Sequence, residues 1–145
     1  MLQQPLKDGG IRSVNFFNGR LLSARDLSRE QDARRQYGAI RVLRWPYHEN
    51  DRAQTARETH GHIKLVTAEN GRILGATIVG AQAGELITTW TLAIGQGLKV
   101  GALLGAVVPY PTLAEIGKRA ATSYYLPSLT SPWVRRIIAL LRWFG

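Results

Sequence analysis

The chain has 145 residues, which is enough for one domain that buries its own apolar core without cross-links. It contains no cysteine, and this excludes disulfide frameworks, thiolate zinc sites and cysteine redox chemistry. The net charge is +9, from 19 basic and 10 acidic residues, but the arginines of the first half are mixed with acids and indicate a solvated face.

The first third of the chain predicts a loose arm followed by a hairpin and a helix. Residues 1–13 are polar, and two apolar runs then flank Asn18-Gly19, a dipeptide typical of hairpin turns. Ser23 is a candidate helix cap, and the helix is expected to stop near Gly38. The apolar face of this helix is thin, so we expect it on the surface.

The middle of the chain predicts a strand, a polar connection, a second hairpin and a helix. Residues 40–45 read as a strand, and residues 47–59 as a polar passage. In residues 62–80, Asn70-Gly71 separates two apolar runs, and the pair favours a tight turn with two positive φ angles. From residue 83 the apolar side chains recur at helical spacing, up to the glycines at 95 and 97.

The last third predicts short helices. A helix near residues 98–104 is expected to be broken by glycines, and a proline-rich turn follows at 109–111. Thr112 and Glu115 have the spacing of a capping box, so a helix is expected from Leu113 towards Tyr125. Residues 131–144 predict a basic amphipathic helix, suited to docking on a partner subunit or another domain, or to an anionic membrane surface.

These elements together predict the fold class. We expect an α+β domain with an antiparallel sheet of three to five strands, helices packed on the sheet, and a C-terminal amphipathic helix. The opening residues lack the apolar centre of a signal peptide, and no apolar run is long enough to cross a bilayer. We therefore expect a cytoplasmic protein.

Four ordered motifs carry a resemblance to a known family. They are Asn50-Asp51-Arg52-Ala53, Gly61-His62-Ile63-Lys64-Leu65-Val66 with Gly71-Arg72-Ile73-Leu74-Gly75-Ala76, Val79-Gly80 with Ala83-Gly84-Glu85-Leu86-Ile87, and Tyr110-Pro111-Thr112-Leu113-Ala114-Glu115. Over residues 39–120, and in the tail, the chain resembles the C-terminal dimerisation domain of the FAD-dependent pyridine nucleotide-disulfide oxidoreductases, such as mercuric reductase and dihydrolipoamide dehydrogenase. The resemblance implies a homodimerisation module.

The first part of the chain departs from this family. The family's opening strand, with its Thr-x-Pro-Glu motif, is absent, although a hairpin and helix in that place would fill the same space. Residues 14–31 resemble instead the start of proteins associated with contractile tail systems. We therefore divide the chain at 38/39, into an N-terminal arm, hairpin and helix (1–38) and a dimerisation domain with its C-terminal helix (39–145). Residues 1–38 are then either foreign to the domain, which makes the chain a composite of two parents, or a divergent form of the family's own start.

The resemblance also bears on catalysis and cofactors. In the family, the segment that matches Tyr110 to Glu115 reaches the flavin of the other subunit, where a His is the acid-base catalyst and a Glu orients it. Tyr110 replaces the His here, and a phenol with an ordinary pKa of about 10 is a poor proton shuttle. We expect no catalytic residue in this chain. FAD and NAD(P) are implied for a full-length member, whose nucleotide-binding domains are missing here, and no cofactor is expected in this chain alone.

The candidate interface residues lie on the central helix and before the next one. They are Trp90, Ile94, Val107, Val108, Tyr110 and Leu113. Glu85 is interpreted as a carboxylate that stabilises the first turn of its helix, with Arg52 as a possible partner of such a carboxylate. His60 and His62 lack a third ligand, so no metal is expected. The glycines form no G-x-G-x-x-G loop, so the usual nucleotide-binding turn is missing.

An alternative class stays open at this point. The basic first half and the C-terminal segment also fit a binding module for nucleic acid or an anionic membrane surface, with nucleic acid the weaker option because no known nucleic-acid-binding motif accompanies the charge. The dependence of binding on salt concentration distinguishes the homodimerisation module from the binding module. Phosphate binding weakens steeply as the salt concentration rises, whereas an apolar dimer does not.

Overall fold

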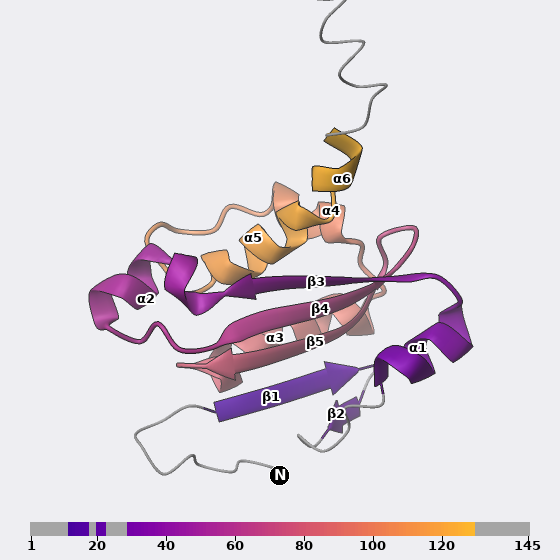
Figure 1. The fold of residues 1–145 in the computed structure, drawn as a ribbon, viewed down its shortest axis with the longest axis horizontal. Helices are drawn as coiled ribbons and strands as arrows, with labels where there is room; N and C mark the ends of the chain where they lie inside the picture. Colours follow the sequence, from indigo (N-terminus) through magenta and orange to yellow (C-terminus); the bar gives the residue numbers. More distant parts are fainter. Residues whose placement is uncertain (1–11, 18–19, 23–28, 130–145) are drawn as a thin grey trace, which may run out of the picture.

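The computed structural model describes residues 12–17, 20–22 and 29–129 (Figure 1). Its strands are β1 (Arg12–Phe17), β2 (Arg20–Leu22), β3 (Ile40–Pro46), β4 (His62–Ala68) and β5 (Ile73–Gly80). Its helices are α1 (Arg29–Tyr37), the 3-10 helix η1 (Tyr47–Glu49), α2 (Asp51–Ala56), α3 (Ala83–Gly95), α4 (Val100–Gly105), α5 (Glu115–Ser123) and α6 (Leu126–Leu129). The predicted helix at 131–144 and the predicted helix start at Ser23 lie outside the described residues.

One five-stranded sheet organises the described residues. The strand order is β2-β1-β5-β4-β3, and every neighbouring pair is antiparallel. The predicted α+β class is confirmed, and so are the two hairpins, β1–β2 and β4–β5. In addition, β1 lies along β5 from the pair Arg12 and Gly80 to the pair Phe17 and Gly75. The first part of the chain therefore supplies a strand to the sheet of the later part.

The turn between β4 and β5 differs from the predicted one. Gly71 has a φ of +84°, but Asn70 does not have a positive φ. The N–H of Gly71 donates to the carbonyl of Ala68 at 3.0 Å, and the N–H of Ala68 donates to the carbonyl of Arg72 at 2.8 Å. These bonds enclose a three-residue loop, in which only the last residue needs the left-handed region. The Asn-Gly signal identified the hairpin correctly and the turn type wrongly.

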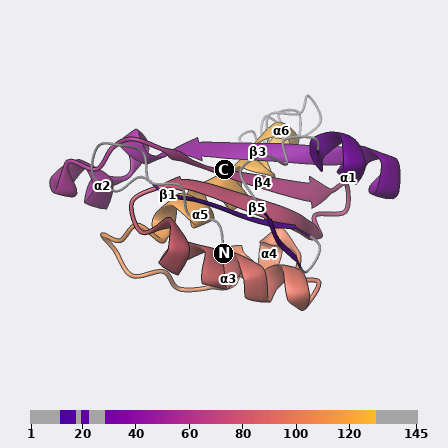
Figure 2. The same cartoon turned by 90° about the horizontal axis from the view of Figure 1, so that it is seen from below.

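The helices α3 and α5 cover one face of the sheet, as Figure 2 shows from below. Helix α3 packs on β1 and β5, and α5 packs on β3 and β4. The main core lies between these helices and the strands. Its buried residues are Leu43, Tyr47, Ala53, Ile63, Leu65, Ile73, Ala76, Ile78, Ala83, Ile87, Trp90, Ala93, Val100, Leu113, Ile116, Ala120 and Ala121.

Two glycines allow close packing in this core. A Cβ at Gly117 would lie 2.6 Å from the indole of Trp90, so the absence of a side chain on α5 lets the α3 tryptophan lie against its backbone. A Cβ at Gly80 would lie 2.7 Å from the ring of Tyr47, and Gly80 has a φ of +144°. The phenol of Tyr47 donates to the carbonyl of Ala81 at 2.8 Å. Thus η1 is held against the end of β5.

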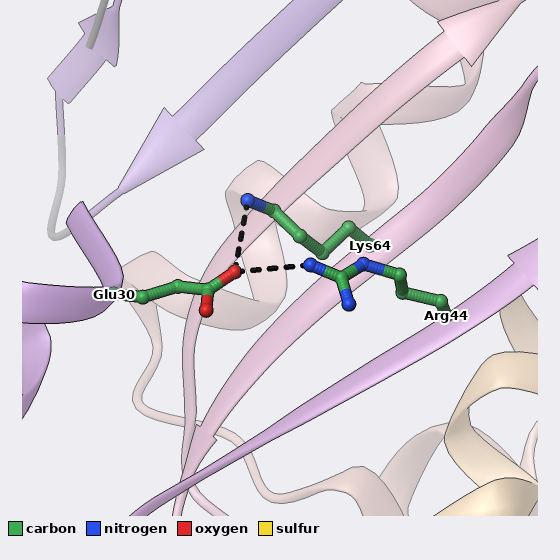
Figure 3. Close-up of polar contacts among 3 residues, drawn as sticks. All are labelled: Glu30, Arg44 and Lys64. Atoms are coloured by element: carbon green, nitrogen blue, oxygen red, sulfur yellow. Dashed lines mark hydrogen bonds and ion pairs between the residues drawn. The ribbon is translucent and has the colours of Figure 1, made fainter. Parts of the chain in front are cut away.

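The opposite face of the sheet is covered more sparsely. Its buried cluster contains Ala33, Ile40, Val66 and Leu74, with α1 packed over one end. Beyond this cluster, one carboxylate oxygen of Glu30 on α1 accepts from Arg44 at 3.2 Å and from Lys64 at 3.4 Å (Figure 3). A single acid on α1 therefore bridges two basic side chains that lie opposite each other on β3 and β4.

Three local predictions are wrong. The polar passage after β3 contains η1 and α2, because the side chain of Asn50 caps α2 by accepting from the N–H of Ala53 at 2.9 Å. Helix α4 continues through Gly101 instead of breaking there. The capping box is absent, because the Thr112 hydroxyl donates to the carbonyl of Pro109 at 2.7 Å and α5 begins at Glu115 without a side-chain cap.

Candidate functional site

Residues 106–112 join α4 to α5 and form the most exposed apolar part of the described surface. The side chain of Val107 is 93% exposed and that of Tyr110 is 68% exposed. Figure 1 shows the connection passing beside α2 before it enters α5. Because exposed apolar side chains that gather in one segment mark contact sites, the segment is a candidate contact surface.

Hydrogen bonds from α5 and within the segment fix its two ends. The Lys118 amine on α5 donates to the carbonyl of Ala106 at 3.0 Å. The Thr112 hydroxyl donates to the carbonyl of Pro109, which closes a short turn before α5. The peptide bond between Tyr110 and Pro111 is cis.

The first residues of α2 contact the same segment. Asn50 is 4% exposed, and its amide nitrogen donates to the carbonyl of Thr112 at 3.0 Å. The phenol of Tyr110 donates to a carboxylate oxygen of Asp51 at 2.7 Å. The motif that begins at Asn50 and the motif that begins at Tyr110 are separated by about sixty residues in sequence and are in contact in the structure. The sequence contained both motifs but no signal that they touch.

The Asp51 contact changes the ionisation of Tyr110. The hydrogen bond to Asp51 and the charge of that carboxylate raise the pKa of Tyr110 above 10, with small further contributions from burial and from Glu115, while Arg119 lowers it. The phenol is therefore protonated throughout the physiological range.

A groove of about 290 Å³ lies beside the segment. Its lining comes from β5, α3, α4, α5 and the segment itself, and it is mostly apolar: Ile78, Leu86, Thr89, Trp90, Leu103, Ala106, Val107, Val108, Pro109, Ala114, Ile116, Gly117 and Lys118. The amine of Lys118 is the one charged group in this lining. The groove therefore favours apolar contacts over the binding of phosphate or of another strongly charged group.

The predicted interface residues separate into two groups. Trp90 and Leu113 are buried within the chain, at 5% and 7% exposure, and contribute to its own core. Val107 and Tyr110 are exposed, and Ile94 and Val108 are half-buried. The sequence analysis missed Leu92 of α3, which is 64% exposed. Its position off the stripe of buried residues Ala83, Ile87, Trp90 and Ala93 was the available signal.

The remaining candidates take no part in this site. Glu85 lies in the first turn of α3, as predicted, and is exposed. Arg52 is exposed on α2 and forms no ion pair with another described residue. Burial, with the charges of Arg44 and Lys64, lowers the pKa of His62. Within the described part of the chain, no three His, Asp or Glu side chains are arranged to hold a metal ion, and no helix is long and apolar enough to span a membrane.

Comparison with known proteins adds independent findings. Residues 28–121 match the model of the family described as pyridine nucleotide-disulphide oxidoreductase, dimerisation domain. Dihydrolipoamide dehydrogenase of Chaetomium thermophilum is 37% identical over 97 residues, 66% of this chain and 19% of that protein. Dihydrolipoyl dehydrogenase of Bacillus subtilis is 34% identical over 113 residues, 77% of this chain and 24% of that protein.

Two solved structures are also similar. LpdA from Mycobacterium tuberculosis has a TM-score of 0.59 and 26% identity, over 64% of this chain and 21% of that one. The HOCl-induced flavoprotein disulfide reductase RclA from Escherichia coli has a TM-score of 0.65 over 77% of this chain and 23% of that one. Its identity of 20% shows likeness of fold alone. The chain spans about a fifth to a quarter of the length of the curated relatives it matches.

Proposed function

Because the chain belongs to the pyridine nucleotide-disulphide oxidoreductases, as a dimerisation domain of that family, we propose that it pairs with a second copy of itself. The contact surface, called here the candidate interface, consists of the exposed Leu92 on α3, the 106–112 segment, and the groove lined by that segment, α3, α4, α5 and β5. Its exposed side chains Leu92 and Val107 carry the proposal, since burying them removes apolar surface from water at no cost in desolvated charge.

The described residues contain no turn of the kind that binds the family's dinucleotides. Such cofactors bind at a glycine-rich turn between a parallel strand and a helix, whereas every strand pair described here is antiparallel. The groove is apolar and has a single cationic group in its lining, so it does not fit a pyrophosphate. We therefore assign FAD and NAD(P) to further domains of a full-length protein and derive no chemical step in this chain.

The remaining proposals concern the position of the domain in a full-length dimer, its cellular location and the origin of its first strands. In a full-length dimer, the segment from Tyr110 to Glu115 is placed at the partner's flavin, as the resemblance implies, with a phenol where other members have an imidazole. We place the protein in the cytoplasm. The family match begins at residue 28, after β1 and β2, which supports a composite origin for the first strands.

The test is the mass of the protein in solution. Sedimentation equilibrium over a range of protein concentrations is expected to show a dimer that 1 M NaCl does not dissociate, since apolar contacts are not screened. Val107→Asp is expected to raise the dissociation constant at least about tenfold, because it buries a charge at the contact.

The matched control is Gln31→Glu, which also adds one negative charge but on α1, away from the candidate interface. It is expected to leave the dissociation constant unchanged. A wild-type chain that stays monomeric at every concentration would refute autonomous dimerisation. Equal weakening by both substitutions would show that net charge, and not the candidate interface, controls association.

A further inference from the structure

The start of α2 and the 106–112 segment are joined by two side-chain hydrogen bonds that the family assignment does not explain. Asn50 donates to the carbonyl of Thr112 at 3.0 Å, and Asp51 accepts from the phenol of Tyr110 at 2.7 Å. Asn50 and Asp51 are neighbours in sequence at the start of α2. Their partners, Thr112 and Tyr110, are two residues apart in the 106–112 segment. We propose that Asn50 and Asp51 are positioning residues, which hold the 106–112 segment in the one conformation that presents Val107 and Tyr110 to the partner subunit.

The geometry of Asn50 supports a dual role. Its side-chain oxygen accepts from the N–H of Ala53 at 2.9 Å, which caps α2, while its nitrogen reaches Thr112. At 4% exposure the amide has no water to replace either partner, so both contacts are needed to satisfy it. The direction of α2 and the position of the segment are therefore set by the same buried group.

Asp51 provides the second hydrogen bond between the start of α2 and the 106–112 segment, which it accepts from Tyr110. Between the ends held by Lys118 and Thr112, residues 107–110 include the two most exposed large apolar side chains of the described residues, Val107 and Tyr110. Without a side-chain contact, a segment this open would sample many conformations and would lose that freedom on binding, at a cost to affinity. The bond from Tyr110 to Asp51 removes part of this cost before the subunits meet. This inference rests on the proposed dimerisation for its function, although the contact itself does not.

Asp51→Asn and Tyr110→Phe test the contact. The first keeps the side-chain shape and removes the charge, and the second removes the donor. NMR titration of the labelled Tyr110 ring carbon is expected to show a pKa that falls towards 10 in Asp51→Asn and recovers in Asp51→Glu. The dimer dissociation constant is expected to rise about three- to tenfold in either single variant, and no further in the double variant, because one variant weakens and the other removes the same hydrogen bond.

Asn50→Asp separates the two roles of Asn50. The aspartate keeps an oxygen to cap α2 but places a second oxygen against the carbonyl of Thr112. We expect α2 to persist while the dimer weakens, because the added oxygen repels the carbonyl of Thr112 and the segment moves away from the start of α2. Glu58→Gln is the control, since it removes one acid after the other end of α2 and leaves Tyr110 and its partner unchanged.

An unchanged Tyr110 pKa in Asp51→Asn would overturn the proposal, because the contact would then not exist in solution. A pKa that falls while the dissociation constant matches that of Glu58→Gln would also overturn it, because the contact would not serve the interface. A monomeric wild type would refute the proposed dimerisation instead. In that monomer, the Tyr110 titration still decides whether Asp51 holds the segment.

Discussion

The two faces of the sheet are built by different means. The face under α3 and α5 is closed by a continuous apolar core in which aromatic rings lie directly on glycine backbone. The opposite face has a four-residue cluster under α1 and then an ion pair at the surface. Packing therefore holds the first face, whereas charge and a small contact hold the second. The difference indicates that substitutions on the face under α3 and α5 should decide whether the chain folds.

Gly80→Ala is expected to have the largest effect. The new Cβ meets the ring of Tyr47 at 2.7 Å, and the backbone φ of +144° disfavours any side chain. The two costs together predict a loss of roughly 3 kcal/mol or more in the free energy of unfolding, measured by urea denaturation.

Gly84→Ala in α3 is the matched control. A Cβ at Gly84 meets no atom within 4 Å, and alanine favours a helix over glycine, so stability should rise by about 0.5 to 1 kcal/mol. Similar losses in both variants would show that glycine content, and not ring packing, explains the result.

Alkaline pH is expected to weaken the same face. Burial, with a smaller contribution from the charge of Glu58, raises the pKa of Tyr47 to about 12. A group whose pKa is raised on folding stabilises the fold below its unfolded pKa of about 10, and this contribution is lost as the pH rises towards 12. The loss should be about 2 to 3 kcal/mol.

Urea denaturation at a series of pH values from 9 to 12 measures this loss. Tyr47→Phe should be less stable at neutral pH by about 1 kcal/mol, because the bond to the Ala81 carbonyl is lost. It should also lack the alkaline decrease. A decrease of the same size in the phenylalanine variant would assign the effect to other groups.

Thr67→Val is expected to change stability in the other direction. The Thr67 side chain is fully buried, and its hydroxyl has no hydrogen-bond partner in the described structure. Valine has nearly the same shape and removes the desolvated hydroxyl, so the free energy of unfolding should rise by about 1 kcal/mol. Thermal denaturation followed by circular dichroism would show a higher midpoint. A lower midpoint would mean that the hydroxyl has a partner in solution.

Glu30→Gln, on the opposite face, is expected to have the smallest effect. Glu30 is one-third exposed and Arg44 is mostly exposed, so water and salt screen the pair. The loss should be below about 1 kcal/mol at low salt and should vanish in 1 M NaCl. A loss as large as that of Gly80→Ala would contradict the contrast between the two faces.

The sequence predicted the elements that have strong local signals. The apolar residues of β3, the Asn-Gly hairpin of β4 and β5, and the helical spacing of α3 are such signals, and all of these elements are present. Helix α2 was missed because it has six residues and a single buried side chain, so no apolar period marks it. The capping box failed because α5 begins later than predicted, with Ala114 at its N-cap, while the Thr112 hydroxyl donates to the carbonyl of Pro109.

The candidate site was predicted less completely. Val107 and Tyr110 were correctly placed on a proline-rich connection, but their exposure depends on the packing of α4 and α5. Trp90 was assigned to an interface because a large aromatic residue on an amphipathic helix fits either a core or a contact surface. Only Gly117, which lies 27 positions later on another helix, explains its burial. The bond between Asp51 and Tyr110 is equally non-local.

The pairing of β1 with β5 has a consequence for the order of folding. Strands β3, β4 and β5 are neighbours in sequence as well as in the sheet, so their pairing closes short loops. The pair Arg12 and Gly80 instead closes a loop of almost seventy residues, which costs more chain entropy before any contact is gained. Pulse-labelled hydrogen exchange during refolding should therefore protect the amides of β4 before those of β1. Strand β1, although it precedes β3, β4 and β5 in the chain, then joins the sheet after them.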